Sequence, residues 1–252
     1  MSPLHALAIF AAGIAAGTIN TVVGSGTLIT FPVLLAFGYA PVTANVSNTI
    51  GLVPGSASGA FGYRRELAGQ RHRTVPLAIA SVLGGAVGAA LLLSLPASAF
   101  KAIVPAFIVI ALCLIVAQPR LSRALAAHRP ATHGRAPGPV VIASVFASGV
   151  YGGYFGAAQG ILLLSILSLG LDEPLQRINA IKVVLAGLVN LVAGIIFALV
   201  ADVAWGAAVL IAGGSIIGGV IGARGGRRLP DRVLRAVIVV VGIAAIVRLL
   251  TS

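Results

Sequence analysis

Two glycine-rich segments carry most of the polar groups that could bind a small ligand. The first is Gly24-Ser25-Gly26-Thr27, and the second runs from Gly156 to Gly160 and includes Gln159. Glycines let the backbone approach a ligand closely, and free N–H groups at the start of a helix bind oxyanions. The two segments therefore predict an anion site of backbone N–H groups, hydroxyls and one amide. The alternative is that the glycines only allow helices to pack tightly.

Lys182 is the charged side chain that the sequence places most clearly inside an apolar segment. Asn179 precedes it by three positions and Asn190 follows it by eight, so the three share one face of a helix. A lysine inside a bilayer is costly and faces a cavity or a partner. We expect Lys182 to supply counter-charge to an anion, with extension to the nearby membrane surface as the alternative. Asn45 and Asn48 are the expected counterparts in the first half of the chain.

Residues suited to catalysis or to metal binding do not cluster. The five acidic residues fall at loops or segment ends, and the four histidines lie at the N-terminus or in basic loops. The single Cys113 excludes an internal disulfide and a thiolate metal cluster. Because nucleophile–base pairs and metal ligands are missing from the apolar segments, we expect no enzyme, no cofactor and no metal.

The elements that must position these residues are membrane helices. The chain has 252 residues, of which 59% are hydrophobic and 9% charged, whereas a soluble domain is about 25% charged. Residues 1–63 contain no Asp, Glu, Lys or Arg, and several other uncharged runs reach the roughly 20 residues that a membrane helix needs. The composition predicts an all-α polytopic membrane protein and excludes a water-soluble enzyme.

Charge breaks and Pro/Gly clusters divide the chain into two similar halves. Gly84-x-x-x-Gly88 in the first matches Gly214-x-x-x-Gly218 in the second, and both runs are expected to be helix-packing seams. We expect a first transmembrane repeat over 1–118, a basic cytoplasmic linker over 119–138 and a second transmembrane repeat over 139–252. The repeats hold about eight apolar segments: 4–38, 43–62, 75–94, 100–118, 139–170, 178–200, 203–223 and 233–250.

The first segment of each half is too long for one crossing. At 1.5 Å per residue, 4–38 would span about 52 Å and 139–170 about 48 Å, against a hydrocarbon core of about 30 Å. We expect each to break at its glycines and turn back to its starting side. That arrangement puts 14 of the Lys and Arg residues on the cytoplasmic side and gives the halves inverted topologies. The alternative is a parallel repeat, which leaves the Arg-rich loop 224–235 outside.

Several motifs occur together in an order typical of one family. In the first half these are Gly24-Ser25-Gly26-Thr27, Phe31-Pro32-Val33-Leu34-Leu35, Gly38 and Ala44-Asn45-Val46-Ser47-Asn48-Thr49. The second half adds Gln176-Arg177-Ile178-Asn179-Ala180-Ile181-Lys182, followed by Asn190. Over nearly its whole length the chain resembles the TauE/SafE family, the sulfite-exporter-type permeases. The resemblance implies a secondary transporter of small anions, often sulfur oxyanions or organosulfonates, in the cytoplasmic membrane of a prokaryote.

The expected partners follow from this function. They are a small anionic substrate, the lipid bilayer and a coupling ion, for which a proton and sodium are both open; the oligomeric state is open too. The net charge of +12 is explained by cytoplasmic loops, so no nucleic-acid partner is expected. An anion channel is the main alternative, because the sequence does not separate a channel from a carrier. A membrane-embedded enzyme is the more remote one.

Overall fold

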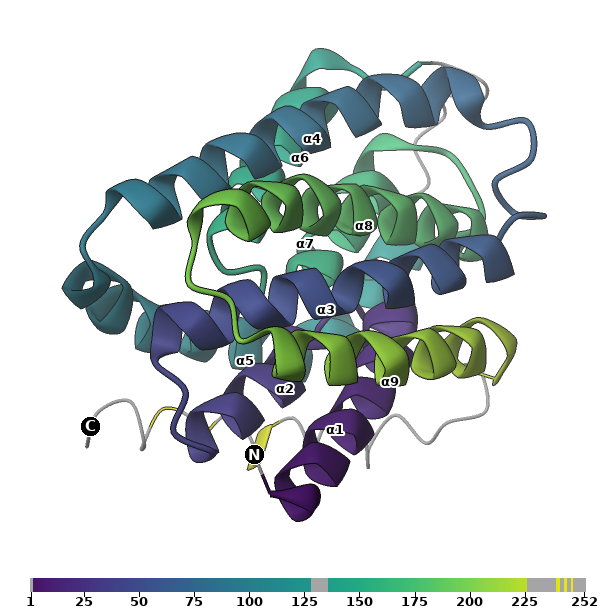
Figure 1. The fold of residues 1–252 in the computed structure, drawn as a ribbon. Coiled ribbons are helices and arrows are strands. Elements are labelled where there is room, and N and C mark those ends of the chain that lie inside the picture. The colour runs from purple at the N-terminus through teal and green to yellow at the C-terminus, as the bar shows by residue number, and fades with distance from the viewer. Residues whose placement is uncertain (1, 128–135, 226–238, 241–242, 244–245, 247–252) are drawn as a thin grey trace.

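The computed structural model describes residues 2–127 and 136–225, together with positions 239, 240, 243 and 246. The described part is helical, which confirms the predicted class (Figure 1). Its helices are α1 (Pro3–Val22), α2 (Thr27–Ala36), α3 (Pro41–Gly62), α4 (Arg71–Ser94), α5 (Ala97–Ala127), α6 (Pro139–Tyr154), α7 (Gln159–Gly170), α8 (Leu175–Val200) and α9 (Trp205–Gly225).

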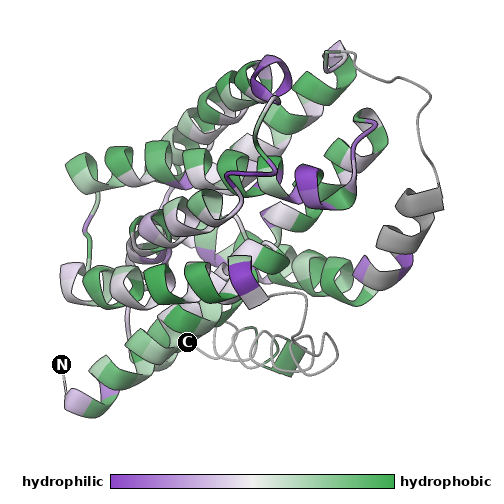
Figure 2. Ribbon diagram, turned by 90° about the vertical axis from the view of Figure 1, so that its right-hand side faces the viewer, coloured by the Kyte–Doolittle hydropathy of each residue, from purple (hydrophilic) through white to green (hydrophobic). Residues whose placement is uncertain are grey.

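Five of the described helices are long and apolar enough to cross a membrane: α1, α4, α5, α8 and α9. Helix α3 is also 22 residues long, but its Asn, Ser, Thr and Gly residues make it less apolar. Figure 2 shows the most hydrophilic residues gathered largely in the loops, while the helix bodies are mainly apolar. Helix α5 continues to Ala127, into the stretch expected as a linker. Most of the segment expected at 233–250 lies outside the described residues.

Both long first segments are broken at their glycines, as the sequence predicted. Residues 23–26 separate α1 from α2, and residues 155–158 separate α6 from α7. Gly24 and Gly156 have φ angles of 90° and 75°, a left-handed conformation that interrupts a right-handed helix and that glycine adopts without penalty. Ala158 also has a positive φ, 59°, which is strained for a residue with a Cβ.

The two halves of the chain are interleaved. Helix α1 packs along α9, and α6 packs along α4, so each broken helix lies against a helix of the other half. In both pairs the residue numbers of the contacts rise together, which means that the paired helices run parallel. The contacts that give these directions pair Gly13 with Ile211, Gly17 with Ser215, Gly84 with Phe146 and Gly88 with Val150.

The same reasoning gives the directions of the central helices. Helix α3 runs parallel to α9 and α4 runs parallel to α8, whereas α3 and α8 are antiparallel. Helices α1, α3 and α9 therefore run in one direction, and α4, α6 and α8 run in the opposite one. For α3 and α9, the contacts pair Gly51 with Ile211 and Gly55 with Ser215. For α4 and α8, they pair Ser81 with Leu185 and Gly85 with Val189. For α3 and α8, they pair Ile50 with Gly194 and Ser56 with Gly187.

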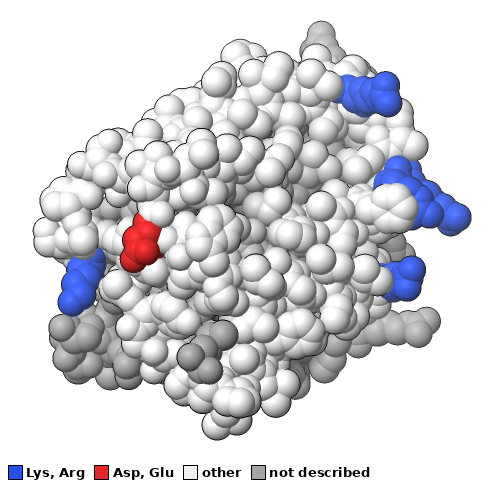
Figure 3. Space-filling view, in the orientation of Figure 1, with Lys and Arg blue, Asp and Glu red and all other residues white. Residues whose placement is uncertain are grey.

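One end of the bundle is rich in arginine. Helices α3 and α9 end there and α4 and α8 begin there, which brings together Arg64, Arg65, Arg71, Arg73, Arg177 and Arg224. Figure 3 shows Lys and Arg side chains gathered along this edge. Glu173 pairs with Arg73 and, at 3.0 Å, with Arg177, so it ties the start of α4 to the start of α8. We call this side the arginine end.

The predicted Gly-x-x-x-Gly seams are confirmed as the places where the halves touch. A Cβ at Gly88 would overlap the carbonyl oxygen of Val150, and one at Gly218 would overlap that of Ile14. By contrast, a Cβ at the buried Gly194 would lie 3.5 Å from its nearest neighbour, an ordinary contact.

We expect Gly88→Ala and Gly218→Ala each to destabilise the protein by about 1–3 kcal/mol, the usual cost of overpacking. Gly194→Ala should leave stability unchanged or raise it slightly, because alanine favours a helix. Thermal unfolding of the purified protein in detergent measures all three. Equal unfolding temperatures for the three variants would contradict these contacts.

Candidate functional site

The two breaks meet inside the protein. The N–H of Gly160 donates to the carbonyl oxygen of Gly24 at 3.0 Å, and a Cβ on either glycine would overlap the Cα of the other. Both glycines are buried. Residues 23–26 and 155–160 therefore form one structure, which we call the break crossing.

The break crossing contains backbone donors that the protein does not use. Among the described residues, the N–H groups of Ser25, Gly26 and Thr27 donate to no protein acceptor, and neither do those of Ala157 and Ala158. The hydroxyl of Ser25 is buried and also has no partner in the part of the chain that the structure describes. Buried polar groups are normally paired, and leaving one unpaired costs free energy. Such a set of donors, at the starts of α2 and α7, is suited to an oxyanion.

The carbonyl ends of the broken helices are held by asparagines from the opposite half. Asn179 on α8 donates through Nδ2 to the carbonyl oxygen of Thr21 at 3.3 Å, at the end of α1. Asn45 on α3 donates through Nδ2 to the carbonyl oxygen of Tyr154 at 3.0 Å, at the end of α6. The Oδ1 atom of each asparagine is buried and has no partner within residues 2–127 and 136–225. The two amides therefore play corresponding parts in the two halves.

Lys182 is completely buried and points into the protein. Its Nζ donates to the carbonyl oxygens of Thr21 at 3.2 Å and Asn20 at 3.4 Å. The last carbonyls of a helix carry partial negative charge, so an ammonium group stabilises them. This position differs from the alternative in which the side chain reaches the membrane surface. It places the charge of Lys182 at the end of α1, three residues before Gly24.

The remaining candidate residues occupy different positions around these breaks. Asn48 contacts Thr27 through an Nδ2–Oγ1 hydrogen bond of 3.2 Å and also accepts a hydrogen bond from Thr30. Gln159 donates to the carbonyl oxygen of Ser148 at 3.2 Å, so its amide faces α6. Asn190 is partly exposed on α8 and is not hydrogen-bonded to the other candidates within the described residues.

Sequence reasoning missed several residues that the structure adds to this region. Thr21 supplies a carbonyl to both Asn179 and Lys182, and Thr30 binds Asn48. Tyr154 supplies the carbonyl that Asn45 binds, and its own hydroxyl is buried without a partner, like that of Ser148. Thr21 and Tyr154 stand two or three positions before the glycines of the expected breaks, which was the local signal that could have found them.

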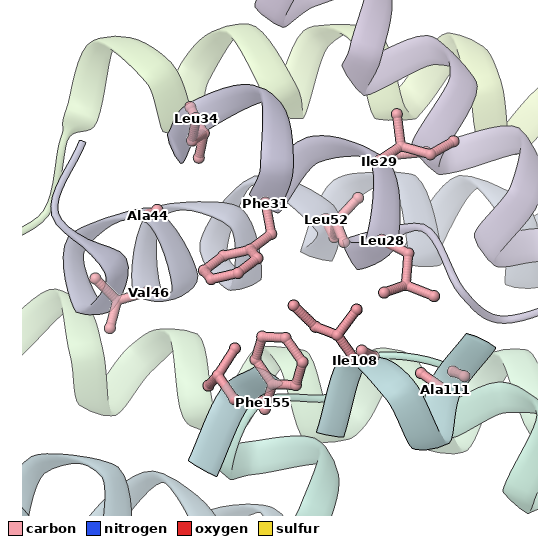
Figure 4. Close-up of a cluster of buried hydrophobic side chains, with 14 of the residues drawn as sticks. Leu28, Ile29, Phe31, Leu34, Ala44, Val46, Leu52, Ile108, Ala111 and Phe155 are labelled. Atoms are coloured by element: carbon pink, nitrogen blue, oxygen red, sulfur yellow. The ribbon is translucent and has the colours of Figure 1, made fainter. Parts of the chain in front are cut away.

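An apolar wall packs around Phe155 of the break crossing. Figure 4 shows Phe31 of α2 and Phe155 of the second break beside Ile108 of α5. The rings of Phe31 and Phe155 are 5.2 Å apart and nearly perpendicular, and Phe100 of α5 lies 6.0 Å from Phe155. Gly24, Gly26, Gly160 and this wall are buried and Gly156 is partly exposed, so most of the break crossing is shut off from the surface, which we call its closed state.

The described residues contain no group of three or more His, Cys, Asp or Glu side chains placed to hold a metal ion. The chemistry of the break crossing therefore rests on backbone N–H groups, hydroxyls, amides and one ammonium group. These groups can bind and orient an anion, and they include no nucleophile–base pair.

Comparisons with known proteins place the chain in one family. The family model described as "Sulfite exporter TauE/SafE" matches residues 9–249. The chain is similar to "Probable membrane transporter protein ORF9" of Sinorhizobium sp, with 28% identity over 98% of this chain and 94% of that protein. It is also similar to "Probable membrane transporter protein YfcA" of Escherichia coli strain K12, with 26% identity over 99% of this chain and 91% of that protein.

A third relative is a "Probable membrane transporter protein" of Haemophilus influenzae, with 28% identity over 86% of this chain and 83% of that protein. No solved structure gave a significant match. The family match covers almost the whole chain, and the apolar helices agree with a multi-pass membrane protein. The chain is a member of the TauE/SafE family of membrane transporters.

Proposed function

We propose that this protein is a secondary transporter that moves small oxyanions, either sulfur oxyanions or organosulfonates, across the cytoplasmic membrane of a prokaryote. One observation carries the proposal: Gly24 and Gly160 touch where the N–H groups of five buried residues have no acceptor among the described residues. A tetrahedral oxyanion offers several acceptor oxygens to such donors. The buried hydroxyl of Ser25 adds a sixth donor.

The closed state of the break crossing favours a carrier over a channel. A carrier exposes its site to one side at a time, so it has states in which the site is shut off from both sides. Gly24, Ser25 and Gly160 are buried in the structure, and so are Phe31 and Phe155. Movement of α5 or α7 away from the other helices would open this wall.

The test is anion flux in proteoliposomes. Sulfite, sulfate, an alkyl sulfonate and chloride are supplied in turn, with imposed pH and sodium gradients. We expect saturable uptake of at least one sulfur oxyanion, with competition among the anions that bind. A dependence on the pH gradient alone would identify the proton as the coupling ion. Voltage-driven unitary currents without saturation would contradict the carrier.

We also propose that the two halves are inverted repeats with re-entrant first segments. Two observations support this: the equivalent helices α1 and α6, α3 and α8, and α4 and α9 run in opposite directions, and α1 runs parallel to α3. A first segment that crossed the membrane once would instead leave α1 and α3 antiparallel. The positive-inside rule then puts the arginine end in the cytoplasm.

Cysteine labelling tests this topology. In a Cys113→Ser background, we expect Asp202→Cys to react with a membrane-impermeant maleimide in intact cells. Arg65→Cys and Gly225→Cys should react only after the membrane is permeabilised. Labelling of Gly225→Cys but not Arg65→Cys in intact cells would favour the parallel repeat and overturn the inverted one.

A further inference from the structure

A basic cavity lies at the arginine end, separate from the break crossing. Its volume is about 660 Å³. Residues of the α3–α4 loop and the first turn of α4 line it, with Val184 of α8 on the far side. Among these lining residues, Arg64, Arg71 and His72 bring basic side chains to the cavity, and all three are exposed.

No carboxylate of the described residues forms an ion pair with the two arginines that line the cavity. Glu173, at the adjoining loop, already pairs with Arg73 and Arg177. Neither Arg64 nor Arg71 forms an ion pair with any described residue, and Glu66 does not line the cavity. The cavity therefore keeps a surplus of positive charge that attracts anions.

Fixed hydrogen-bond donors add to this charge. Helix α4 is 24 residues long and begins at Arg71, next to the cavity. The backbone N–H groups of Arg71 and His72 donate to no acceptor among the described residues, and the Oγ1 atom of Thr74 is buried without a partner while its residue lines the cavity. Helix starts and hydroxyls of this kind bind phosphate groups.

The surroundings of the cavity are suited to a lipid. Arg64 lies over the ring of Phe61 at 4.6 Å, and Phe61 is 70% exposed. On α4, an exposed apolar stripe of Val75, Ile79 and Leu83 begins directly after the cavity residues and runs into the membrane span. A molecule with a phosphate group in the cavity could lay an acyl chain along this stripe.

We propose that this cavity binds a phosphate group, and that its source is the headgroup of an anionic phospholipid whose acyl chains lie along α4. The proposal is independent of the anion site at the break crossing. The apolar stripe favours the lipid over free inorganic phosphate, which would gain nothing from Val75, Ile79 and Leu83. An anionic lipid bound there holds the α3–α4 loop against α8.

The experiment compares two double variants with the same loss of charge. Arg64→Gln/Arg71→Gln alters the cavity, and Arg65→Gln/Arg224→Gln removes two exposed arginines of the same end that do not line it. The full-length protein is placed in phosphatidylcholine nanodiscs with increasing phosphatidylglycerol. Thermal unfolding and native mass spectrometry then measure stabilisation and bound lipid.

We expect phosphatidylglycerol to stabilise the wild type and the control variant, and to bind the cavity variant at least about tenfold more weakly. A second arm adds inorganic phosphate to protein in detergent. Stabilisation by phosphate without any gain from phosphatidylglycerol would overturn the lipid source. Equal responses of the two double variants would overturn the cavity as the site, because surface charge alone would then explain binding.

Thr74→Val provides an independent test. The hydroxyl has no hydrogen-bond partner in the described part of the chain, so its loss should leave the unfolding temperature without anionic lipid unchanged or slightly higher. The affinity for phosphatidylglycerol should still fall severalfold, an effect that a purely structural residue would not show. An unchanged affinity would overturn the placement of the phosphate at the start of α4.

Discussion

Alanine at Gly24 is expected to abolish anion flux. The residue has a φ of 90°, where a Cβ costs about 1–2 kcal/mol. The added Cβ would also overlap the Cα of Gly160, so the two breaks would have to separate. Because the hydrogen bond between Gly160 and Gly24 holds the breaks together, the N–H groups of the proposed anion site would no longer lie close together. Flux in proteoliposomes, normalised to the amount of reconstituted protein, measures the effect.

Two controls separate a lost site from a weakened fold. Gly218→Ala introduces a similar overlap at the α1–α9 seam, away from the break crossing, so it should lower stability while flux per folded molecule stays near normal. Ser25→Ala removes a hydroxyl but keeps the backbone, and its flux should fall only moderately. If Gly24→Ala folds and transports like Gly218→Ala, the anion does not bind at the break crossing.

The substitution Lys182→Met is expected to reduce anion flux to the background level. Methionine keeps the approximate length of the side chain but removes its charge, and the carbonyl oxygens of Asn20 and Thr21 lose their ammonium donor. Asn179 still donates to the carbonyl oxygen of Thr21, so the carbonyl oxygen of Asn20 is the one that loses its donor, at a cost of up to about 1–3 kcal/mol of stability. The positive charge next to the first break is lost as well. We therefore expect the affinity for the anion, measured from anion-induced thermal stabilisation, to fall at least about tenfold.

Lys101→Met is the matched control, because it removes the same charge from an exposed side chain at the end of the bundle opposite the arginine end. Its flux and stability should match the wild type. Lys182→Arg should be partly active, since the guanidinium group has a planar shape and a different hydration. Normal flux in Lys182→Met with lowered stability would show that the lysine only holds the end of α1.

The parts of the structure that follow local rules could be predicted from the sequence. The length of the apolar segments predicted the helices that span the membrane. In each half, a first segment too long for one crossing predicted a break. Glycine adopts a left-handed turn without penalty, so each break could be assigned to a glycine-rich stretch, although not to one particular glycine. The Gly-x-x-x-Gly spacing predicted seams because small residues four apart share one helix face.

The arrangement between the halves could not be predicted in the same way. Asn45 binds a carbonyl of residue 154, and Lys182 binds carbonyls of residues 20 and 21, across more than a hundred positions of the chain. Nothing near Lys182 distinguishes a carbonyl partner from an anion or from the membrane surface, because all three satisfy an ammonium group. The packing of Gly88 against Val150 likewise depends on which helix α4 meets.

The interleaving of the halves has a consequence for biosynthesis. Helix α1 emerges first from the ribosome, but its partner α9 begins only at Trp205. At about 5–20 residues per second, on the order of ten seconds or more pass before α9 is made. During that time the glycine face of α1 is exposed to lipid or to the insertion machinery. A chain stalled after α5 would hold α1 without this partner, so quality-control proteases would have a defined target in every incomplete chain.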